Sequence, residues 1–366
     1  MISALGSCIK NEPLNTEADI TKCILPEGVA KSDPKITDDN VLAFIVPGTV
    51  DITAVAPEFE VTPGATIAPA SGTRRDFTEA QKYTVTSQDG QWSKTYTVTI
   101  TEAEMNTKYD FENWEIVNEK YAVPYEIMGA SEEGDVVDDS QIQYIWSSGN
   151  AGYALTGGGG KPDKFPTCYT EGAFSGQYAA KLVTRATGTF GIALKMPIAA
   201  GNLFIGSFDG MSATKDPMKA TQFGLPFGKK PLRLTGHYHY LSGGNITDEF
   251  NKPVVPAKRD SCQIYAVLYE TDDEVKCLYG DNVLTSPNLV AVALLDSPTE
   301  SDNWQAFDVE FRYLKPFDEQ KRQSYKYNLA VVFSASRDGA RFRGAVGSTL
   351  WIDEVEVVCE EPVVNP

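Results

Sequence analysis

The sequence predicts an all-β protein in which a small β-sandwich is followed by a larger one. Aromatic residues are abundant, with 17 Tyr, 17 Phe and 5 Trp, and 30 Gly and 21 Pro supply many turns. This composition suits half-buried strands separated by turns. No long stretch has an apolar period of about 3.6 residues, so helices should be few. The length of 366 residues suits two domains.

The first domain is expected over residues 20–104, after a polar tether over residues 1–19. Its clearest element is a hairpin, in which a strand over residues 83–86 runs into a turn signal at residues 87–90. The return strand over residues 92–100 alternates apolar and polar side chains. About 80 residues of this kind fit an immunoglobulin-like (Ig-like) β-sandwich.

The second domain is expected over residues 105–366 and has longer strands of the same alternating kind. These strands are predicted over residues 232–240, 262–268, 307–313, 325–333 and 350–358. They most simply form a jelly-roll β-sandwich. The domain is longer than its strands require, and the surplus lies in Gly-, Pro- and Asp-rich loops, where binding sites often lie.

Charge and cysteine content exclude several classes of partner and site. The 32 basic and 50 acidic residues give a net charge of −18. Phosphate backbones and anionic membrane surfaces should repel such a chain, so neither is an expected partner. The six cysteines form no CxxC pair, and no histidine lies at zinc-ligand spacing from any of them, which argues against a zinc site. Most of them are expected to be buried thiols.

The first residues indicate a lipid anchor. The stretch Leu5-Gly6-Ser7-Cys8 looks like a bacterial lipobox, in which the cysteine is lipidated. A basic region and an apolar core should precede it, and most of both is missing, so a chance match is the alternative. No run of 18 or more apolar residues predicts a membrane-spanning helix. Membrane contact is therefore expected only through Cys8.

Few side chains in the sequence suit catalysis. The two histidines, His237 and His239, share one face of a strand, so they could clip a metal or belong to a polar face. No GxSxG turn accompanies them, as a serine hydrolase of that type would require. A pair of carboxylates for glycoside hydrolysis must lie about 5–9 Å apart across a cleft, and a sequence does not measure this distance.

Aromatic residues give a sharper functional hypothesis, because flat rings stack on the apolar faces of sugars while polar side chains reach the hydroxyl groups. Trp304 lies on the polar parity of its strand, and Trp146 lies in a turn-rich stretch. Both are candidate stacking residues, although a tryptophan at a strand end can instead pack over the rim of the core. The candidate polar partners are Asn150, Tyr153 and Arg343.

Several motifs are similar to those of known families. Residues 51–59, 63–69, 76–78, 83–86 and 96–99 resemble the Ig-like N-terminal module of secreted lipoproteins from Gram-negative gut bacteria. Residues 110–114, 146–152, 236–240 and 344–355 resemble the putative carbohydrate metabolism domain (PCMD) family. The resemblance implies an Ig-like sandwich followed by a jelly roll like that of carbohydrate-binding modules, in the context of glycan use. It supplies no catalytic residues.

A structural calcium ion is also expected, because jelly-roll binding modules often hold one between their first and last strands. Glu112 and Asp353 lie in those two predicted strands and are the candidate ligands. Calcium prefers about 6–8 oxygen ligands, so backbone carbonyl groups would have to complete the set.

The favoured hypothesis is a non-catalytic, glycan-binding lipoprotein of the cell envelope, anchored to the outer membrane. Its partner would be a polysaccharide or oligosaccharide, together with other envelope proteins of glycan uptake. Two alternatives stay open: a glycoside hydrolase on the same jelly roll, and a structural adhesion or assembly subunit. A hydrolase needs two facing carboxylates, a binder needs exposed rings, and an assembly subunit needs an exposed apolar patch or strand edge.

Overall fold

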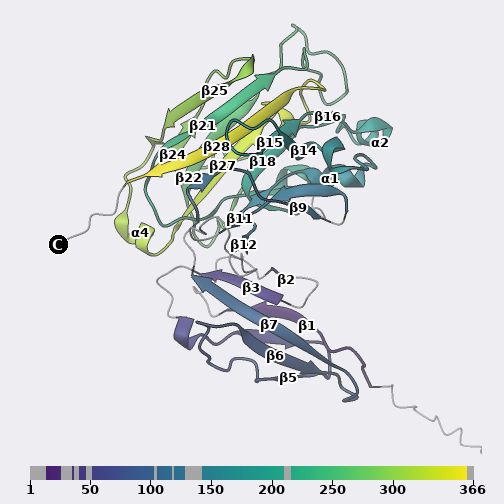
Figure 1. The fold of residues 1–366 in the computed structure, drawn as a ribbon, viewed down its shortest axis with the longest axis vertical. Coiled ribbons are helices and arrows are strands. Elements are labelled where there is room, and N and C mark those ends of the chain that lie inside the picture. Colours follow the sequence, from purple (N-terminus) through teal and green to yellow (C-terminus); the bar gives the residue numbers. More distant parts are fainter. Residues whose placement is uncertain are drawn as a thin grey trace, which may run out of the picture. The chain divides into compact units, whose positions relative to one another are not determined.

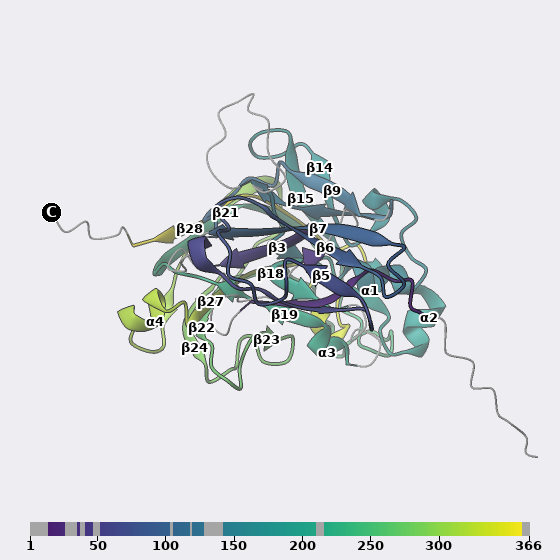
Figure 2. The same cartoon turned by 90° about the horizontal axis from the view of Figure 1, so that it is seen from below.

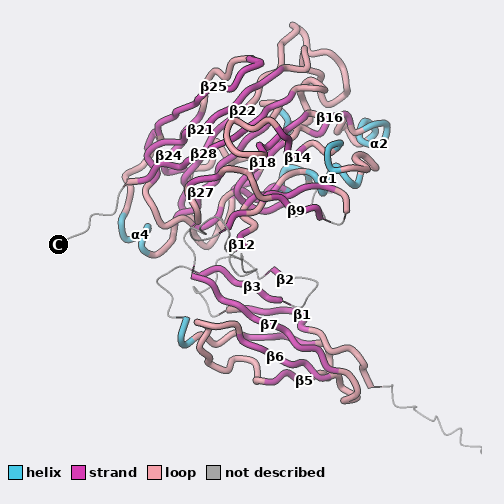
Figure 3. Tube along the Cα trace, in the orientation of Figure 1, coloured by secondary structure: helices cyan, strands magenta, loops and turns pink. Residues whose placement is uncertain are grey.

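The computed structural model describes residues 14–25, 35–36, 41–46, 52–102, 105–117, 119–127, 142–209 and 216–360. Strands dominate these residues, and the helices are short pieces between strands (Figures 1 and 3). The all-β prediction is confirmed. The chain divides into two compact units, Met1–Glu104 and Met105–Pro366.

The N-terminal unit has a two-stranded and a five-stranded sheet among its described residues. The strands are β1 (Ile20–Ile24), β2 (Lys35–Ile36), β3 (Val41–Val46), β4 (Glu58–Val61), β5 (Thr66–Ala68), β6 (Gln81–Thr86) and β7 (Ser93–Glu102), with a 3-10 turn, η1, at Ile52–Ala54. In the larger sheet the order is β2-β3-β7-β6-β5, and β3 runs parallel to β7. One buried cluster contains side chains from both sheets.

The predicted hairpin is confirmed as β6 and β7, which pair antiparallel from Thr86 opposite Ser93 to Gln81 opposite Val98. The apolar parity of β7 is buried, because Tyr96 and Val98 belong to the core cluster of this unit. Trp92 shares that parity in the sequence but precedes β7, and 63% of it is exposed. Trp92 therefore lies outside the core of this unit.

The C-terminal unit contains two main sheets. The larger sheet has nine strands among the described residues. Seven of them follow the order β23-β19-β18-β27-β22-β24-β26, while β13 pairs with β18 and β20 pairs with β27. Its strands are β13 (Trp146–Ser147), β18 (Asn202–Phe208), β19 (Thr221–Phe223), β20 (Leu225–Pro226), β22 (Gln263–Glu270), β23 (Leu278–Tyr279), β24 (Leu289–Leu294), β26 (Arg312–Tyr313) and β27 (Tyr327–Ser334).

In the smaller sheet the order is β14-β15-β28-β21-β25, with β8 beside β28. Its strands are β8 (Lys108–Tyr109), β14 (Thr167–Glu171), β15 (Tyr178–Val183), β21 (Pro231–Leu241), β25 (Ser301–Glu310) and β28 (Thr349–Cys359). The neighbours β25, β21 and β28 are seen side by side in Figure 1. The pairing of β21 with β28 shifts register beside Gly236, where β28 carries the extra residue. A Cβ at position 236 would lie 2.7 Å from Phe307 Cζ and 3.2 Å from Val355 Cα, so the close packing here requires glycine.

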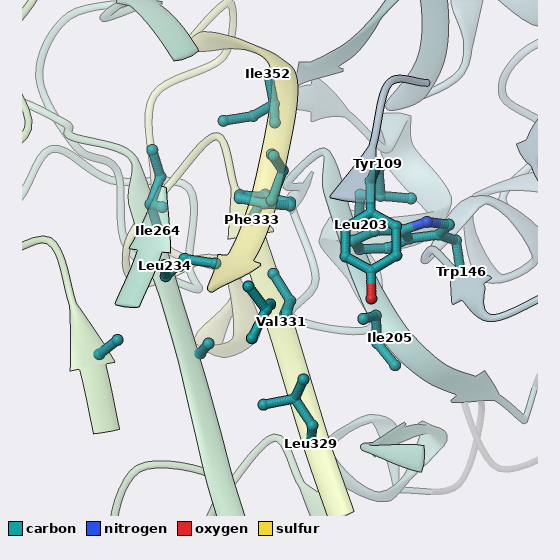
Figure 4. Packing of buried hydrophobic residues seen from close by; sticks show 14 of the residues in the cluster. Tyr109, Trp146, Leu203, Ile205, Leu234, Ile264, Leu329, Val331, Phe333 and Ile352 are labelled. Atoms are coloured by element: carbon teal, nitrogen blue, oxygen red, sulfur yellow. The ribbon is translucent and has the colours of Figure 1, made fainter. Parts of the chain in front are cut away.

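The core of this unit lies between the two sheets. One buried cluster joins Leu234 and Ile352 of the smaller sheet to Leu203, Val331 and Phe333 of the larger (Figure 4). Alternate residues of each strand point into this layer, as period-two patterning predicts. The two sheets therefore form a β-sandwich, which leaves each sheet with an outer face.

Short elements connect these strands. The small pairs are β9 (Trp114–Val117) with β10 (Tyr121–Pro124), β11 (Glu126–Ile127) with β12 (Ile142–Gln143), and β16 (Arg185–Ala186) with β17 (Ile198–Ala199). The helices are α1 (Asn150–Leu155), α2 (Gly188–Ala193), α3 (Pro217–Ala220) and α4 (Glu319–Gln323), and 3-10 turns lie at η3 (Pro162–Lys164) and η5 (Gly339–Arg341). Figure 2 shows α3 close to β19 and β23.

Candidate functional site

The outer face of the smaller sheet carries a row of ring side chains. Residues that pair directly across strands point to the same face. Lys181 of β15 pairs with Trp351 of β28, which in turn pairs with His239 of β21. The ring of Trp304 on β25 lies edge-on to His239, with 4.9 Å between the centroids. Four adjacent strands thus place side chains in one line.

The loop between β14 and β15 adds a further ring to this face. Phe174 stacks on His237, with 3.6 Å between ring centroids and 10° between planes. The same phenyl ring meets Trp304 edge-on at 6.2 Å. Phe174 is 47% exposed, so its outer surface is open to solvent. A large apolar ring held at this exposure, on a rigid support, is a feature of ligand-binding surfaces.

The rings support one another along the row. His239 stacks on Trp351 with 3.9 Å between centroids, and Lys181 Nζ lies 5.7 Å from the centroid of the Trp351 ring. Burial lowers the pKa of His239 below its ordinary value of 6.5. At neutral pH this imidazole is therefore an uncharged ring. We call the set the aromatic platform; it consists of Phe174, Lys181, His237, His239, Trp304 and Trp351.

Two carboxylates hold the Phe174 loop in place. Asp353 Oδ2 accepts hydrogen bonds from the backbone N–H groups of Phe174, at 2.8 Å, and Ser175, at 3.1 Å. Glu112 Oε1 accepts from the N–H groups of Gln177, at 2.8 Å, and Tyr178, at 3.1 Å. Hydrogen bonds to ionised acceptors are the stronger ones, so the loop is fixed at both ends and Phe174 is pre-positioned.

Gly176 makes the Glu112 contact possible. Its φ is +68°, and an added Cβ would lie 2.1 Å from Glu112 Oε1. Asp353 is fully buried beneath the loop, and this burial raises its pKa to about 6. At neutral pH it is still largely ionised, as an acceptor of backbone N–H groups should be.

These contacts do not fit a calcium site built on Glu112 and Asp353. Backbone N–H groups point at the oxygen atoms that a cation would need, and their positive ends repel a cation. In the described part of the chain, no cluster of three or more His, Cys, Asp or Glu side chains is placed to bind a metal. The two predicted ligands instead position the loop of the aromatic platform.

The prediction that Trp146 stacks on a glycan is wrong. Trp146 is 1% exposed and packs against Tyr109, Phe111 and Phe333 in the core, as Figure 4 shows for Tyr109. Its Nε1–H donates to Glu126 Oε1 at 2.7 Å. β13 pairs with β18, and this pairing turns the indole inward.

The predicted polar partners also lie away from the platform. Asn150 is 0% exposed and bonds the backbone of Thr167 through both ends of its amide, so it cannot reach a ligand. The hydroxyl of Tyr153 donates to Ala186 O at 3.3 Å. Arg343 lies 3.8 Å from Glu249, and none of its described contacts involves a platform ring. Cys8 lies outside the described residues.

Of the predicted glycan-site residues, Trp304 alone lies in the aromatic platform. The alternation of β28 could have located Trp351, because Leu350 and Ile352 point inward and the residue between them must point outward. The shared parity of His237 and His239 was a further signal. No pattern in the sequence pointed to Phe174, because its loop lies over the sheet only in the tertiary structure.

The family models match most of the chain. The model described as "putative carbohydrate metabolism domain" (PCMD) matches residues 110–358, which includes every residue of the platform. The chain belongs to the PCMD family. A second model, described as "SGBP, N-terminal", matches residues 28–100 and indicates association with the cell envelope. The match to PCMD indicates a function related to carbohydrate.

Two solved structures are similar to this PCMD protein. One, described as a "putative glycoside hydrolase" from Bacteroides thetaiotaomicron, is 46% identical, covers 96% of this chain and 99% of its own, and has a TM-score of 0.77. The other carries the same description, comes from Bacteroides vulgatus, and is 38% identical over 70% of this chain and 99% of its own, with a TM-score of 0.61. No curated protein matches significantly.

Proposed function

We propose that this PCMD protein is a non-catalytic glycan-binding protein of the cell envelope, and that it binds polysaccharide or oligosaccharide chains on the aromatic platform. The observation that carries this proposal is the exposed ring of Phe174, backed by His237 and placed beside Trp304. A flat apolar surface among polar groups matches the apolar face and hydroxyl edge of a pyranose.

The carboxylates beside the platform favour binding over hydrolysis. A glycosidase needs two carboxyl groups that face the same bond, about 5–9 Å apart. Asp353 is fully buried, and its oxygen atoms accept N–H groups of Phe174, Ser175 and Glu354. Glu112 likewise accepts backbone N–H groups. The description of the two similar structures makes hydrolysis the second candidate, and a reducing-sugar assay on the same glycans tests it.

The binding test rests on Trp304→Ala. An aromatic anchor typically contributes about 2 kcal/mol or more, so we expect affinity to fall roughly thirtyfold, as measured by isothermal titration against a glycan selected on an array. The melting temperature should change little, because Trp304 lies on the outer face and outside the core clusters. Phe174→Ala should weaken binding to a similar degree.

Two exposed rings outside the platform are matched controls. Trp92 is 63% exposed in the N-terminal unit and Phe190 is 55% exposed on α2, and their alanine variants should bind as the wild type does. Unchanged affinity in both Trp304→Ala and Phe174→Ala would refute the platform as the site. Release of reducing ends from a bound glycan would show that the protein is a hydrolase, contrary to the proposal.

We also propose that the protein is anchored to the outer membrane by acylation of Cys8. In the described part of the chain, no helix is long and apolar enough to span a bilayer. Acyl chains contribute about 0.8 kcal/mol per buried CH₂ group, so two or more chains hold a protein firmly. Expressed with a complete signal sequence, the wild type should sediment with membranes, and Cys8→Ala should be found in the soluble fraction. Equal release of both would refute the anchor.

A further inference from the structure

The outer face of the larger sheet holds a cavity that is separate from the aromatic platform. Phe204, Phe223, Tyr265 and Val332 line it and pack together in a second buried cluster. Leu203 and Ile205, the sequence neighbours of Phe204, belong instead to the core between the sheets. The cavity therefore opens on the side of the sandwich opposite to the platform.

The cavity is large enough for one sugar residue. Its volume is about 180 Å³. A single water needs roughly 10–15 Å³ of such space, so the cavity can hold a ligand much larger than water. It has room for a single pyranose ring with its hydroxyl groups.

The walls combine flat apolar surfaces with unpaired polar groups. Tyr153, Phe223 and Phe342 present rings to the cavity. Gln263 and Asn202 also line it. Asn202 Oδ1 accepts a hydrogen bond from the Gly149 N–H, which leaves the amide nitrogen of Asn202 available to a ligand. Rings beside free amides make the same combination that sugars require.

Tyr265 gives the clearest indication of a ligand. It is 3% exposed and lines the cavity, and no hydrogen bond to its hydroxyl occurs among the described residues. Burial raises the pKa of this phenol above its ordinary value, so the hydroxyl keeps its proton and can donate. The hydroxyl is not among the fully buried side-chain atoms without a partner, so it faces the space of the cavity, where a hydroxyl group of a ligand can pair with it.

Backbone strain at the wall points the same way. Phe342 has φ of 57° and ψ of 31°, a left-handed conformation that is uncommon for a residue with a Cβ. Such strain is found preferentially at ligand sites, where the surrounding structure maintains it. Here it follows the 3-10 turn η5 and places the phenyl ring at the cavity.

We propose that this cavity binds one pyranose residue, with the rings stacking on its faces and Tyr265, Gln263 and Asn202 bonding its hydroxyl groups. No Asp or Glu belongs to the described lining, so the site binds the sugar without hydrolysing it. The protein thus carries two carbohydrate sites of different shape: a flat platform for a chain and a cavity for a single residue.

The test uses the full chain and a panel of methyl glycosides of neutral hexoses and uronic acids, measured by saturation-transfer NMR and titration. At least one probe should bind the wild type. Tyr265→Phe removes only the hydroxyl and should weaken binding about three- to tenfold, as the loss of one neutral hydrogen bond does. Gln263→Leu should have a similar effect.

Two further variants locate the binding. Tyr313→Phe removes a hydroxyl that bonds Pro231 O away from the cavity and should leave binding unchanged. Trp304→Ala should also leave it unchanged, because the platform lies on the other sheet. The proposal is overturned if no probe binds, if Tyr265→Phe and Gln263→Leu bind as the wild type does, or if Trp304→Ala abolishes binding of the monosaccharide.

Discussion

Replacing Trp146 by alanine should lower the free energy of unfolding of the C-terminal unit by about 3–5 kcal/mol. The indole is 1% exposed and has ring contacts with Tyr109 at 5.1 Å, Phe111 at 5.3 Å and Phe333 at 6.1 Å. Alanine would leave a cavity among these rings, and the surrounding core cannot close it completely. The substitution also removes the Nε1–H group that donates a hydrogen bond to Glu126.

Chemical unfolding monitored by circular dichroism measures this loss. Trp92→Ala is the matched control, since its side chain is 63% exposed in the N-terminal unit and should change stability by less than about 0.5 kcal/mol. Where the Trp146→Ala protein remains folded, it should still bind glycan, because the indole does not reach the platform. A stable Trp146→Ala protein that has lost glycan binding would restore Trp146 as a ligand residue.

The strands of this protein could be predicted well from alternation alone. In β21, Leu234, Tyr238 and Tyr240 are buried while His237 and His239 point outward, as period-two patterning requires. The same pattern assigned Trp304 to the outer face. Each of these residues lies within a long strand, where alternation decides the direction of its side chain.

The residues that the sequence wrongly assigned to the glycan site lie where no long strand fixes the direction of their side chains. Trp146 is in the two-residue strand β13, and Asn150 and Tyr153 lie on the short helix α1. Their burial depends on β18 and on the backbone of Thr167, which are distant in the sequence. Phe174 could not be predicted for the same reason. It is a loop residue, and its position depends on Asp353 and His237, which are distant in the sequence.

Glu126 predicts an unusual dependence of stability on pH. It is buried on β11, and this burial raises its pKa to about 8, with a smaller contribution from the negative charge of Asp110. The hydrogen bond from Trp146 Nε1–H acts in the opposite direction but is the weaker influence. At neutral pH the folded protein therefore holds Glu126 largely as the neutral acid, whereas the unfolded chain ionises it.

The sign of the effect follows from proton binding. Below the unfolded pKa of 4.5 both states are protonated, so Glu126 introduces no pH dependence. Between 4.5 and about 8 the folded state binds one more proton, so the free energy of unfolding decreases as pH rises. At about 1.4 kcal/mol per pH unit, the loss approaches roughly 5 kcal/mol when pH 8 is passed. Raising the pH thus weakens the C-terminal unit.

Glu126→Gln should remove this dependence, because a neutral amide keeps the shape of the acid and its Oε1 can still accept the Trp146 N–H. We expect the variant to gain stability over the wild type steadily from pH 5 to pH 8.5, as measured by calorimetry of the full chain at several pH values. The comparison between variants is needed because Asp353, whose pKa is raised to about 6, contributes a dependence of the same sign in both proteins. Glu171→Gln, at an exposed position at the end of β14, is the control and should follow the wild type at every pH. Parallel curves for wild type and Glu126→Gln would show that Glu126 is ionised in the folded protein, and that water reaches the Glu126 carboxyl group beside Trp146.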